Sequence, residues 1–340
     1  MIKVFRRYNS YRISHLIKIE PHVEERSSMT YIEFANAVEK MMNGKMMGGV
    51  HASLYTAMKN NGKERTGILI EMPGINISPT IYLEEYYESY MAGRQLEQIV
   101  EDIVKLYEEI RLDRPWDCEA FRDYEGVKDR IVFKLVNTVK NRKFLSNVPH
   151  LAFLDLSIVF YVLVDVSEEG TAAMVINSIH ANSWKIQTET LWEDAVKNVR
   201  NLLPAEFVTM NHALKALMGQ EDYDSGDLFL EEQQDYDQMY VLSNKFRNYG
   251  AACIAYPNVL EMIGQILKKD YYILPSSVHE VIIVPYSEGF VCSKLDKMVQ
   301  EINSTQVEEE DVLSSHVYLY SRNSGKLRVG STVQTGRMMA

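Results

Sequence analysis

Residues 151–164, LAFLDLSIVFYVLV, form the longest apolar run of the sequence. Such a run is either a membrane-spanning helix or a buried strand, and its length and composition decide between the two. The run has 14 residues and is interrupted by Asp155 and Ser157, whereas a membrane-spanning helix needs about 20 apolar residues. Its second half, from Ile158 to Val164, consists almost entirely of β-branched and aromatic residues, which favour strands. The run therefore predicts a buried strand over residues 151–166 and no membrane helix.

Upstream of this run, helical spacing of apolar residues predicts three helices. The first covers residues 30–42 and opens with the capping box Thr30-Tyr31-Ile32-Glu33. The second is expected to begin at Ser78-Pro79, a favourable N-cap and first helical residue, and to carry a broad tyrosine face. The third covers residues 94–111. The tyrosine face comprises Tyr82, Tyr86, Tyr87 and Tyr90.

Hairpins are predicted on both sides of the apolar run. Asn60-Asn61-Gly62 supplies the positive φ of a tight turn between strands at 50–59 and 66–72. A strand at 128–138 precedes the run, and a strand at 171–176 is expected to pair with it. Downstream, a helix is predicted at 188–203 and two more after Pro257 and Val291. The remaining strands are expected at 239–243, 251–255, 271–274, 278–284, 316–321 and 326–329.

These elements predict an α+β protein with mixed sheets, hairpins and packed amphipathic helices, because strand–helix alternation is incomplete. At about 100–200 residues per domain, 340 residues suggest two lobes. We expect a disordered N-terminal extension at 1–28, a helical lobe with a β-hairpin at 29–125 and an α/β-type region at 126–330. A flexible acidic loop is expected at 220–237 and a tail at 331–340. Whether Met1 or Met29 is the natural start stays open.

Charge and cysteine content exclude several classes of function. The net charge is −11, and residues 221–238 hold eight acids and no base, so no basic face for nucleic acid is expected. The three cysteines, Cys118, Cys253 and Cys292, lie far apart and form no C-x-x-C pair, which favours a reduced, cytoplasmic setting. No phosphate-binding glycine loop and no histidine pair with metal-ligand spacing occurs, so neither a cofactor nor a metal is predicted.

The segment Pro275-Ser276-Ser277-Val278-His279-Glu280 holds the residue types of a serine hydrolase. Ser276 or Ser277 would be the nucleophile and His279 the base, with Asp155 or Glu280 as the orienting acid. However, residues 277 and 279 share one face of the expected strand, residue 280 points away, and no G-x-S-x-G elbow is present. The pattern favours a polar turn that caps backbone groups.

Asp155 and the tyrosine face each allow two interpretations. A carboxylate inside an apolar run is costly to bury unless it is paired, so Asp155 is either functional or held by a structural partner at a strand end. Tyrosine is common in binding hot spots, but helical tyrosines more often pack their rings and leave their hydroxyls in water. The acids at 220–237 are expected to form a solvated loop.

Six segments carry a resemblance to a known family: NISPTIYLEEYYESYMAGRQLEQIVEDIVKLYEE (76–109), DRIVFKLVN (129–137), VPHLAFLDLSIVFYVLV (148–164), NLLPAE (201–206), ILPSSVHEVIIVP (273–285) and INSTQV (302–307). Together they resemble DUF5688, a family of unknown function that is mostly clostridial and belongs to the Firmicutes. The resemblance covers roughly residues 30–330, and residues 150–300 are more distantly similar to the YtpQ-like uncharacterised proteins of bacilli. It implies a bacterial, cytoplasmic protein that is sometimes carried with mobile elements, and it supplies no catalytic residues.

The sequence therefore favours a non-catalytic protein-binding or regulatory module with a protein partner, and no direct contact with nucleic acid or membrane. A serine-hydrolase-like enzyme using Ser276 or Ser277, His279 and Asp155 is the first alternative. A counter-defence protein of a mobile element, which blocks a nucleic-acid enzyme, is the second.

Overall fold

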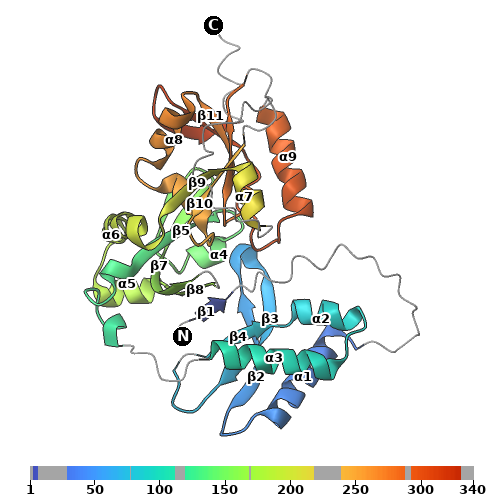
Figure 1. The fold of residues 1–340 in the computed structure, drawn as a ribbon. Helices are drawn as coiled ribbons and strands as arrows, with labels where there is room; N and C mark the ends of the chain where they lie inside the picture. The colour runs from blue at the N-terminus through green and yellow to red at the C-terminus, as the bar shows by residue number, and fades with distance from the viewer. Residues whose placement is uncertain are drawn as a thin grey trace. The chain divides into compact units, whose positions relative to one another are not determined.

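The computed structural model describes residues 3–6, 29–76, 78–111, 119–167, 170–217, 239–287 and 292–330 (Figure 1). The chain forms two compact units: unit 1 is Met1–Gly126 with Leu163–Met174, and unit 2 is Val127–Val162 with Val175–Ala340. The expected acidic loop and tail, and residues 7–28 of the expected extension, lie outside the described residues. Residues Lys3–Arg6 form strand β1, which pairs antiparallel with β8 (Gly170–Val175).

Unit 1 contains a three-stranded antiparallel sheet in the order β2-β3-β4. Strands β2 (His51–Met58) and β3 (Glu64–Glu71) form the predicted hairpin. The turn between them, η3 (Asn60–Gly62), places Asn61 at φ 59° and Gly62 at φ 72°. The Asn-Gly prediction is therefore confirmed, because both residues adopt the left-handed backbone that this pair tolerates.

Strand β4 (Thr80–Tyr82) stands where Ser78-Pro79 predicted the start of a helix. It pairs with Gly67–Leu69 of β3, and a Cβ at Gly67 would lie 2.7 Å from the carbonyl oxygen of Ile81. The glycine thus permits a close backbone approach, and the β-branched and aromatic residues of β4 fit a sheet edge. Helix α2 (Glu84–Met91) begins only after Leu83. The predicted helix start was wrong, and Tyr82 lies on a strand.

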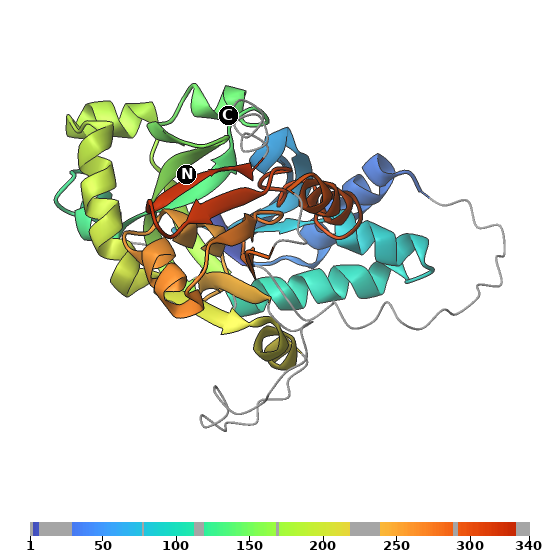
Figure 2. The same ribbon diagram turned by 90° about the horizontal axis from the view of Figure 1, so that it is seen from above.

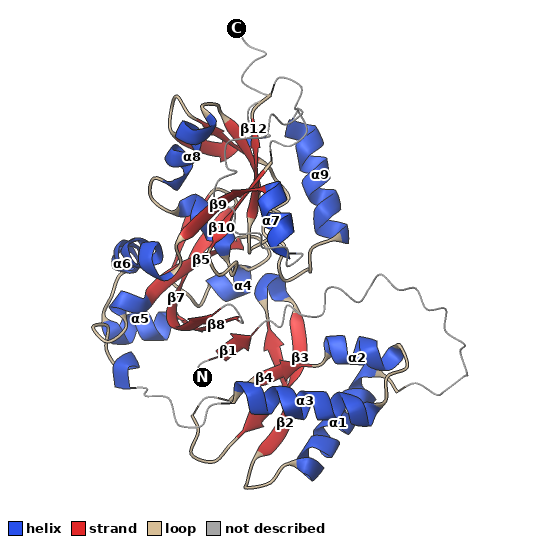
Figure 3. Ribbon diagram, viewed as in Figure 1, coloured by secondary structure: helices blue, strands red, loops and turns tan. Residues whose placement is uncertain are grey.

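Helices α1 (Tyr31–Lys45) and α3 (Leu96–Ile110) complete unit 1 and confirm two predicted helices. The Thr30 hydroxyl accepts from Glu33 N–H and the Glu33 carboxylate accepts from Thr30 N–H, so the capping box is formed. The apolar stripes of α1 and α3 share one core with the sheet. Figure 3 shows the two helices beside the strands of unit 1. Its largest fully buried members include Phe34, Met42, Ile68, Ile70, Leu83, Ile99, Ile103 and Tyr107.

The outer edge of β2 is covered by side chains of α1. Asn43 donates from Nδ2 to Ala52 O at 2.7 Å and accepts from Ala52 N–H at 2.9 Å. Glu39 Oε1 accepts from Leu54 N–H at 3.0 Å. Exposed edge strands invite pairing with other chains, and here helix side chains satisfy the backbone groups instead.

Unit 2 contains a six-stranded antiparallel sheet in the order β14-β13-β11-β12-β10-β9. Helices α8 (Val259–Leu267) and α9 (Cys292–Thr305) lie on opposite faces of it (Figure 2). Tyr272 and Leu319 pack against α9, while the Tyr271 hydroxyl, on the other face, donates to Leu260 O. The strands are β9 (Ala205–Thr209), β10 (Tyr240–Asn244), β11 (Tyr271–Leu274), β12 (Val281–Pro285), β13 (Tyr318–Ser321) and β14 (Lys326–Val329).

The apolar run at 151–164 forms a hairpin rather than one strand. Strand β6 (His150–Phe153) turns through Leu154, at φ 56°, and Asp155 into β7 (Leu156–Ser167). The single-strand prediction was wrong because hydrophobic periodicity gives no sign of a turn made by Leu154. Strand β7 also pairs with β5 (Ile131–Asn137), and helix α6 (Thr188–Leu202) packs on β5. The predicted strand at 128–138 and the predicted helix at 188–203 are thereby confirmed as elements.

The strand predicted at 251–255 was wrong, and the strand predicted at 278–284 is confirmed only from Val281 on, as β12. Residues 251–255 belong to the 3-10 helix η7 (Gly250–Ala255), which is buried by its tertiary surroundings. Residues 278–280 precede β12, so Ser277 and His279 do not lie on a regular strand. Ser277 forms an isolated bridge with Val312.

Four elements of unit 2 were not predicted from the sequence. They are α4 (Arg142–Leu145), α5 (Ser178–Trp184), α7 (Met210–Leu217) and β9.

The α+β class is confirmed, although the sheets are antiparallel where mixed sheets were expected. Hairpin turns join β2 to β3 and β13 to β14, whereas helices lie between β10 and β11 and between β12 and β13. Every strand pair with a described register is antiparallel all the same. None of the helices in the described ranges combines the length and apolar character that a membrane crossing requires.

We predict that Asn43→Ala lowers the free energy of unfolding by about 1–2 kcal/mol, because it removes both hydrogen bonds to Ala52 at the sheet edge. Asn36→Ala is the matched control on the same helix, since Asn36 is exposed and its side chain donates to Ile32 O within the helix rather than to the sheet. It should change stability by less than about 0.5 kcal/mol. Denaturant unfolding measures both variants, and equal effects would contradict the edge role of Asn43.

Candidate functional site

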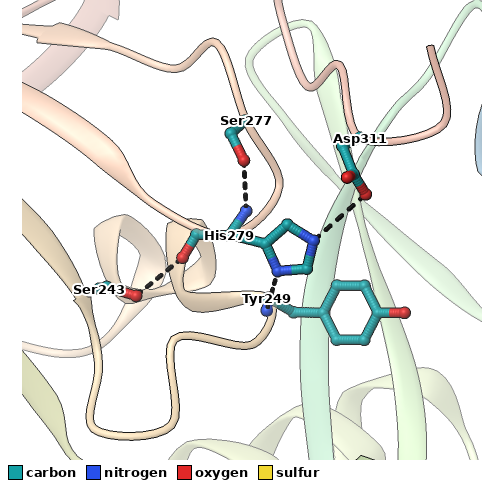
Figure 4. Close-up of polar contacts among 5 residues, drawn as sticks. All are labelled: Ser243, Tyr249, Ser277, His279 and Asp311. Atoms are coloured by element: carbon teal, nitrogen blue, oxygen red, sulfur yellow. Dashed lines mark hydrogen bonds and ion pairs between the residues drawn. The ribbon is translucent and has the colours of Figure 1, made fainter. Parts of the chain in front are cut away.

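The serine–histidine segment of unit 2 lies in the loop between β11 and β12. Ser277 and His279 are both buried. The Ser277 hydroxyl accepts from the backbone N–H of His279 at 3.0 Å, as Figure 4 shows, and does not contact its imidazole. Ser276 is half-buried, and its carbonyl accepts from Leu313 N–H at 3.0 Å. The two serines thus hold backbone in place.

Both ring nitrogens of His279 have partners of their own. Nδ1 lies 3.3 Å from the backbone N–H of Tyr249, and Nε2 lies 3.2 Å from Oδ1 of Asp311 (Figure 4). A backbone N–H can only donate, so Nδ1 must accept and the proton sits on Nε2, where it is donated to Asp311. The Tyr249 ring stacks on the imidazole with centroids 5.5 Å apart. No lone pair of His279 is therefore directed at either serine.

Asp155 is held elsewhere in unit 2, in the turn between β6 and β7. Its carboxylate accepts from the Ser314 hydroxyl at 2.7 Å and from the Tyr318 hydroxyl at 2.5 Å. Burial, and next the Asp155 carboxylate, raise the pKa of Tyr318 well above its usual range. The structure therefore brings Asp155 to residues 314 and 318, and His279 to Asp311, a residue that the sequence did not single out.

Tight backbone packing surrounds His279. The Ser243 hydroxyl donates to His279 O at 2.8 Å, and Gly250 lies against the same carbonyl. Burial raises the pKa of the Cys253 thiol to about 12, and this thiol donates to Ser243 O at 3.2 Å. A thiol that stays protonated is a poor nucleophile. The hydrogen bonds around His279 therefore chiefly hold the loop between β11 and β12 against β10 and η7.

The four tyrosines expected to form one helical face are divided between two elements of unit 1. Tyr82 lies on β4, where the Lys59 ammonium sits 3.9 Å from its ring centroid. Tyr86, Tyr87 and Tyr90 lie on α2, half-buried against the core. Tyr87 and Tyr90 stack at 6.3 Å, and both contact Phe34 of α1 at 5.3 Å.

Tyr31 joins this ring cluster and borders a pocket of about 510 Å³. Its ring meets Tyr87 edge-on at 5.2 Å, and its hydroxyl donates to Oε1 of Glu84 at 3.1 Å. Burial first, then the Glu84 carboxylate, raise the pKa of Tyr31. The pocket is lined by Tyr31, Thr56, Glu64, Thr66, Glu84, Tyr87 and Glu88.

Glu84 connects the pocket to the sheet. Its Oε1 also accepts from Thr66 N–H at 2.8 Å, while its Oε2 is buried and has no hydrogen-bond partner among the described residues. Sequence reasoning identified Tyr87 but missed Tyr31 and Glu84, which lie 53 positions apart. Nothing local in the sequence indicates that they meet.

A family model described as "Family of unknown function (DUF5688)" matches residues 31–322. The chain belongs to this family. The matched range of DUF5688 contains Tyr31, Glu84 and Tyr87 of the pocket as well as His279 and Asp155. Comparisons with curated proteins and with solved structures find no match.

We predict that a fluorophosphonate probe does not label the chain stoichiometrically, because the Ser277 hydroxyl faces backbone and neither serine contacts an imidazole nitrogen. The probe should be tested on the wild type, Ser276→Ala and Ser277→Ala, beside an active serine hydrolase as positive control. Labelling that is lost in one of the two variants would establish the serine as a nucleophile and overturn this interpretation.

We predict that Gly250→Ala destabilises unit 2 by more than about 2 kcal/mol. A Cβ there would lie 2.1 Å from Ser243 Oγ, 2.5 Å from Asn244 N and 2.6 Å from His279 O, and the last two atoms are backbone. Gly44→Ala is the control, since its Cβ meets nothing within 4 Å. Thermal unfolding should show a large decrease in melting temperature for Gly250→Ala and little change for Gly44→Ala.

Proposed function

We propose that the protein is a non-catalytic protein-binding module whose contact surface is the tyrosine-lined pocket of unit 1. The observation that carries this proposal is the pocket of about 510 Å³ bordered by Tyr31 and Tyr87. Small, largely preformed pockets with aromatic walls and a few fixed polar groups are typical binding sites. Tyrosine adds large contact area at low entropic cost and is enriched in hot spots.

The rings are held in place before any partner arrives. Tyr87 packs against Tyr31, Phe34 and Tyr90, and its hydroxyl donates to Met29 O at 3.0 Å. Preorganised groups lose little freedom on binding, so more of the interaction energy contributes to affinity. The cluster thus supports recognition better than a mobile surface tyrosine would.

The setting that we propose is cytoplasmic. Support comes from the cysteines: Cys253 and Cys292 are free thiols, and both are buried. Thiols that persist without pairing are usual in reducing compartments.

We predict that a photo-crosslinking phenylalanine analogue at Thr56, an exposed position of the pocket lining, captures one distinct host protein. The same analogue at Val139, which is 63% exposed in unit 2, is the control. Crosslinked proteins are identified by mass spectrometry from native-host lysate, and the partner is then purified for binding measurements.

Tyr87→Ala should weaken that purified complex at least about tenfold, as expected for a hot-spot tyrosine. Tyr87→Phe keeps the ring and should retain most of the affinity. Identical captures at Thr56 and Val139, or equal affinity of wild type and Tyr87→Ala, would refute the proposed contact surface.

A further inference from the structure

We propose that strand β9 is a docking edge, on which a second copy of this chain pairs through its own β9, antiparallel about a twofold axis. Strand β9, labelled in Figure 1, ends the six-stranded sheet of unit 2 and pairs on one side only, with β10. None of its five residues is buried. The edge belongs to unit 2, whereas the pocket belongs to unit 1, so this inference does not depend on the proposed function.

The backbone groups of β9 point alternately toward β10 and away from it. Lys245 N–H donates to Pro204 O at 2.9 Å, and a matching bond closes the other end of the pair. Because hydrogen-bonding direction alternates along antiparallel strands, the even-numbered residues of β9 face β10. Ala205, Phe207 and Thr209 therefore direct their N–H groups outward. Within the described ranges, the outward groups of Ala205 and Phe207 have no hydrogen-bond partner.

This edge is complementary to itself. A twofold axis through Phe207 sets this residue opposite its own copy, and two N–H···O bonds then join the pair. On either side of the axis, the Thr209 N–H of one copy faces the Ala205 carbonyl of the other. Glu206 lies opposite Val208, so no like charges meet directly, and the central pair is aromatic. The same register thus satisfies the outward backbone groups and avoids charge repulsion.

The other end of the same sheet lacks this complementarity. In β14 (Lys326–Val329), the outward backbone groups belong to Leu327 and Val329, by the same alternation. Pairing of two copies through them would set the exposed Arg328 directly opposite Arg328, and like charges in that position are destabilising. Charged residues, lysine above all, and proline protect natural edge strands. Strand β9 contains no lysine, arginine or proline.

The expected dimer is reversible. A five-residue ladder buries far less than the roughly 1,200–2,000 Å² of a stable interface. In sedimentation equilibrium of the full chain, we expect monomer at about 1 µM and a growing dimer population between about 50 and 500 µM. A chain that stays monomeric over this whole range would overturn the proposal.

Single cysteines test the register in a Cys118→Ser background. The two copies of residue 207 would form a hydrogen-bonded pair with Cα atoms about 5.5 Å apart, a separation that a disulfide spans. Phe207→Cys should therefore give a disulfide-linked dimer when oxidised glutathione is added.

Glu206→Cys and Val208→Cys are the matched controls for the register. Alone, each places its two copies on a diagonal of about 7–8 Å, which is too long for an unstrained disulfide. Mixed, the two variants lie directly opposite each other and should crosslink at least about fivefold more than either does alone. Equal crosslinking of Phe207→Cys, Glu206→Cys and Val208→Cys, each alone, would refute this register.

Phe207→Pro tests the backbone contact. It removes the outward N–H at the axis but no hydrogen bond to β10, and edge strands accept proline at such positions. We expect dimerisation to weaken at least about tenfold. Phe207→Ala keeps the N–H but loses the ring, which stacks on Tyr240 at 4.9 Å, and should weaken it less. Thermal unfolding checks that both variants fold; if Phe207→Pro does not, the cysteine crosslinks decide alone.

Two further results would overturn the assignment to a second copy. A dimer that forms equally well in Phe207→Pro and in wild type, with no crosslink in Phe207→Cys, would place the contact between copies elsewhere. A chain that stays monomeric, while a photo-crosslinking phenylalanine analogue at Phe207 captures an extended strand of another protein, would assign the edge to a foreign strand.

Discussion

The carboxylate of Glu84 fixes the geometry of unit 1. It begins α2, accepts from Thr66 N–H on β3 and accepts from the Tyr31 hydroxyl on α1. Three elements distant in sequence are thereby joined through one oxygen atom. The contact also borders the pocket, because it holds the Tyr31 hydroxyl against α2 while the Tyr31 ring meets Tyr87 edge-on. The other carboxylate oxygen is buried and has no donor among the described residues.

The two clusters of polar residues differ in how far their hydrogen bonds are satisfied. Around His279, both imidazole nitrogens, the backbone N–H and the carbonyl all have partners within the protein. Asp155 is likewise occupied by Ser314 and Tyr318. A satisfied buried network rigidifies loops and has little capacity left for a substrate. The pocket of unit 1 is lined by three glutamates, two threonines and two tyrosines, and the buried Oε2 of Glu84 has no donor among the described residues.

Much of the fold could be predicted because local patterns were strong. The capping box at Thr30 and Glu33, the Asn61-Gly62 turn and the apolar stripe of α3 each depend on neighbouring residues, and all three are confirmed. The failures share a different cause. Strand β4 depends on a close approach to Gly67, and the buried helix η7 carries the apolar composition of a strand. In both, tertiary packing overrides local propensity.

The candidate site was predictable only in part. Tyr87 and Tyr90 stood out because their spacing places them on one face of a helix, and the sequence alone determined that these rings lie together. It also determined the α+β class and the absence of recognised catalytic motifs, since these depend on residue type and short-range spacing. Only the tertiary structure decided that Tyr31 meets Glu84 across 53 positions, and that Asp155 reaches Ser314 across 159. Hydrogen bonds between distant residues follow from how helices and strands pack, and short-range sequence patterns carry no record of that packing.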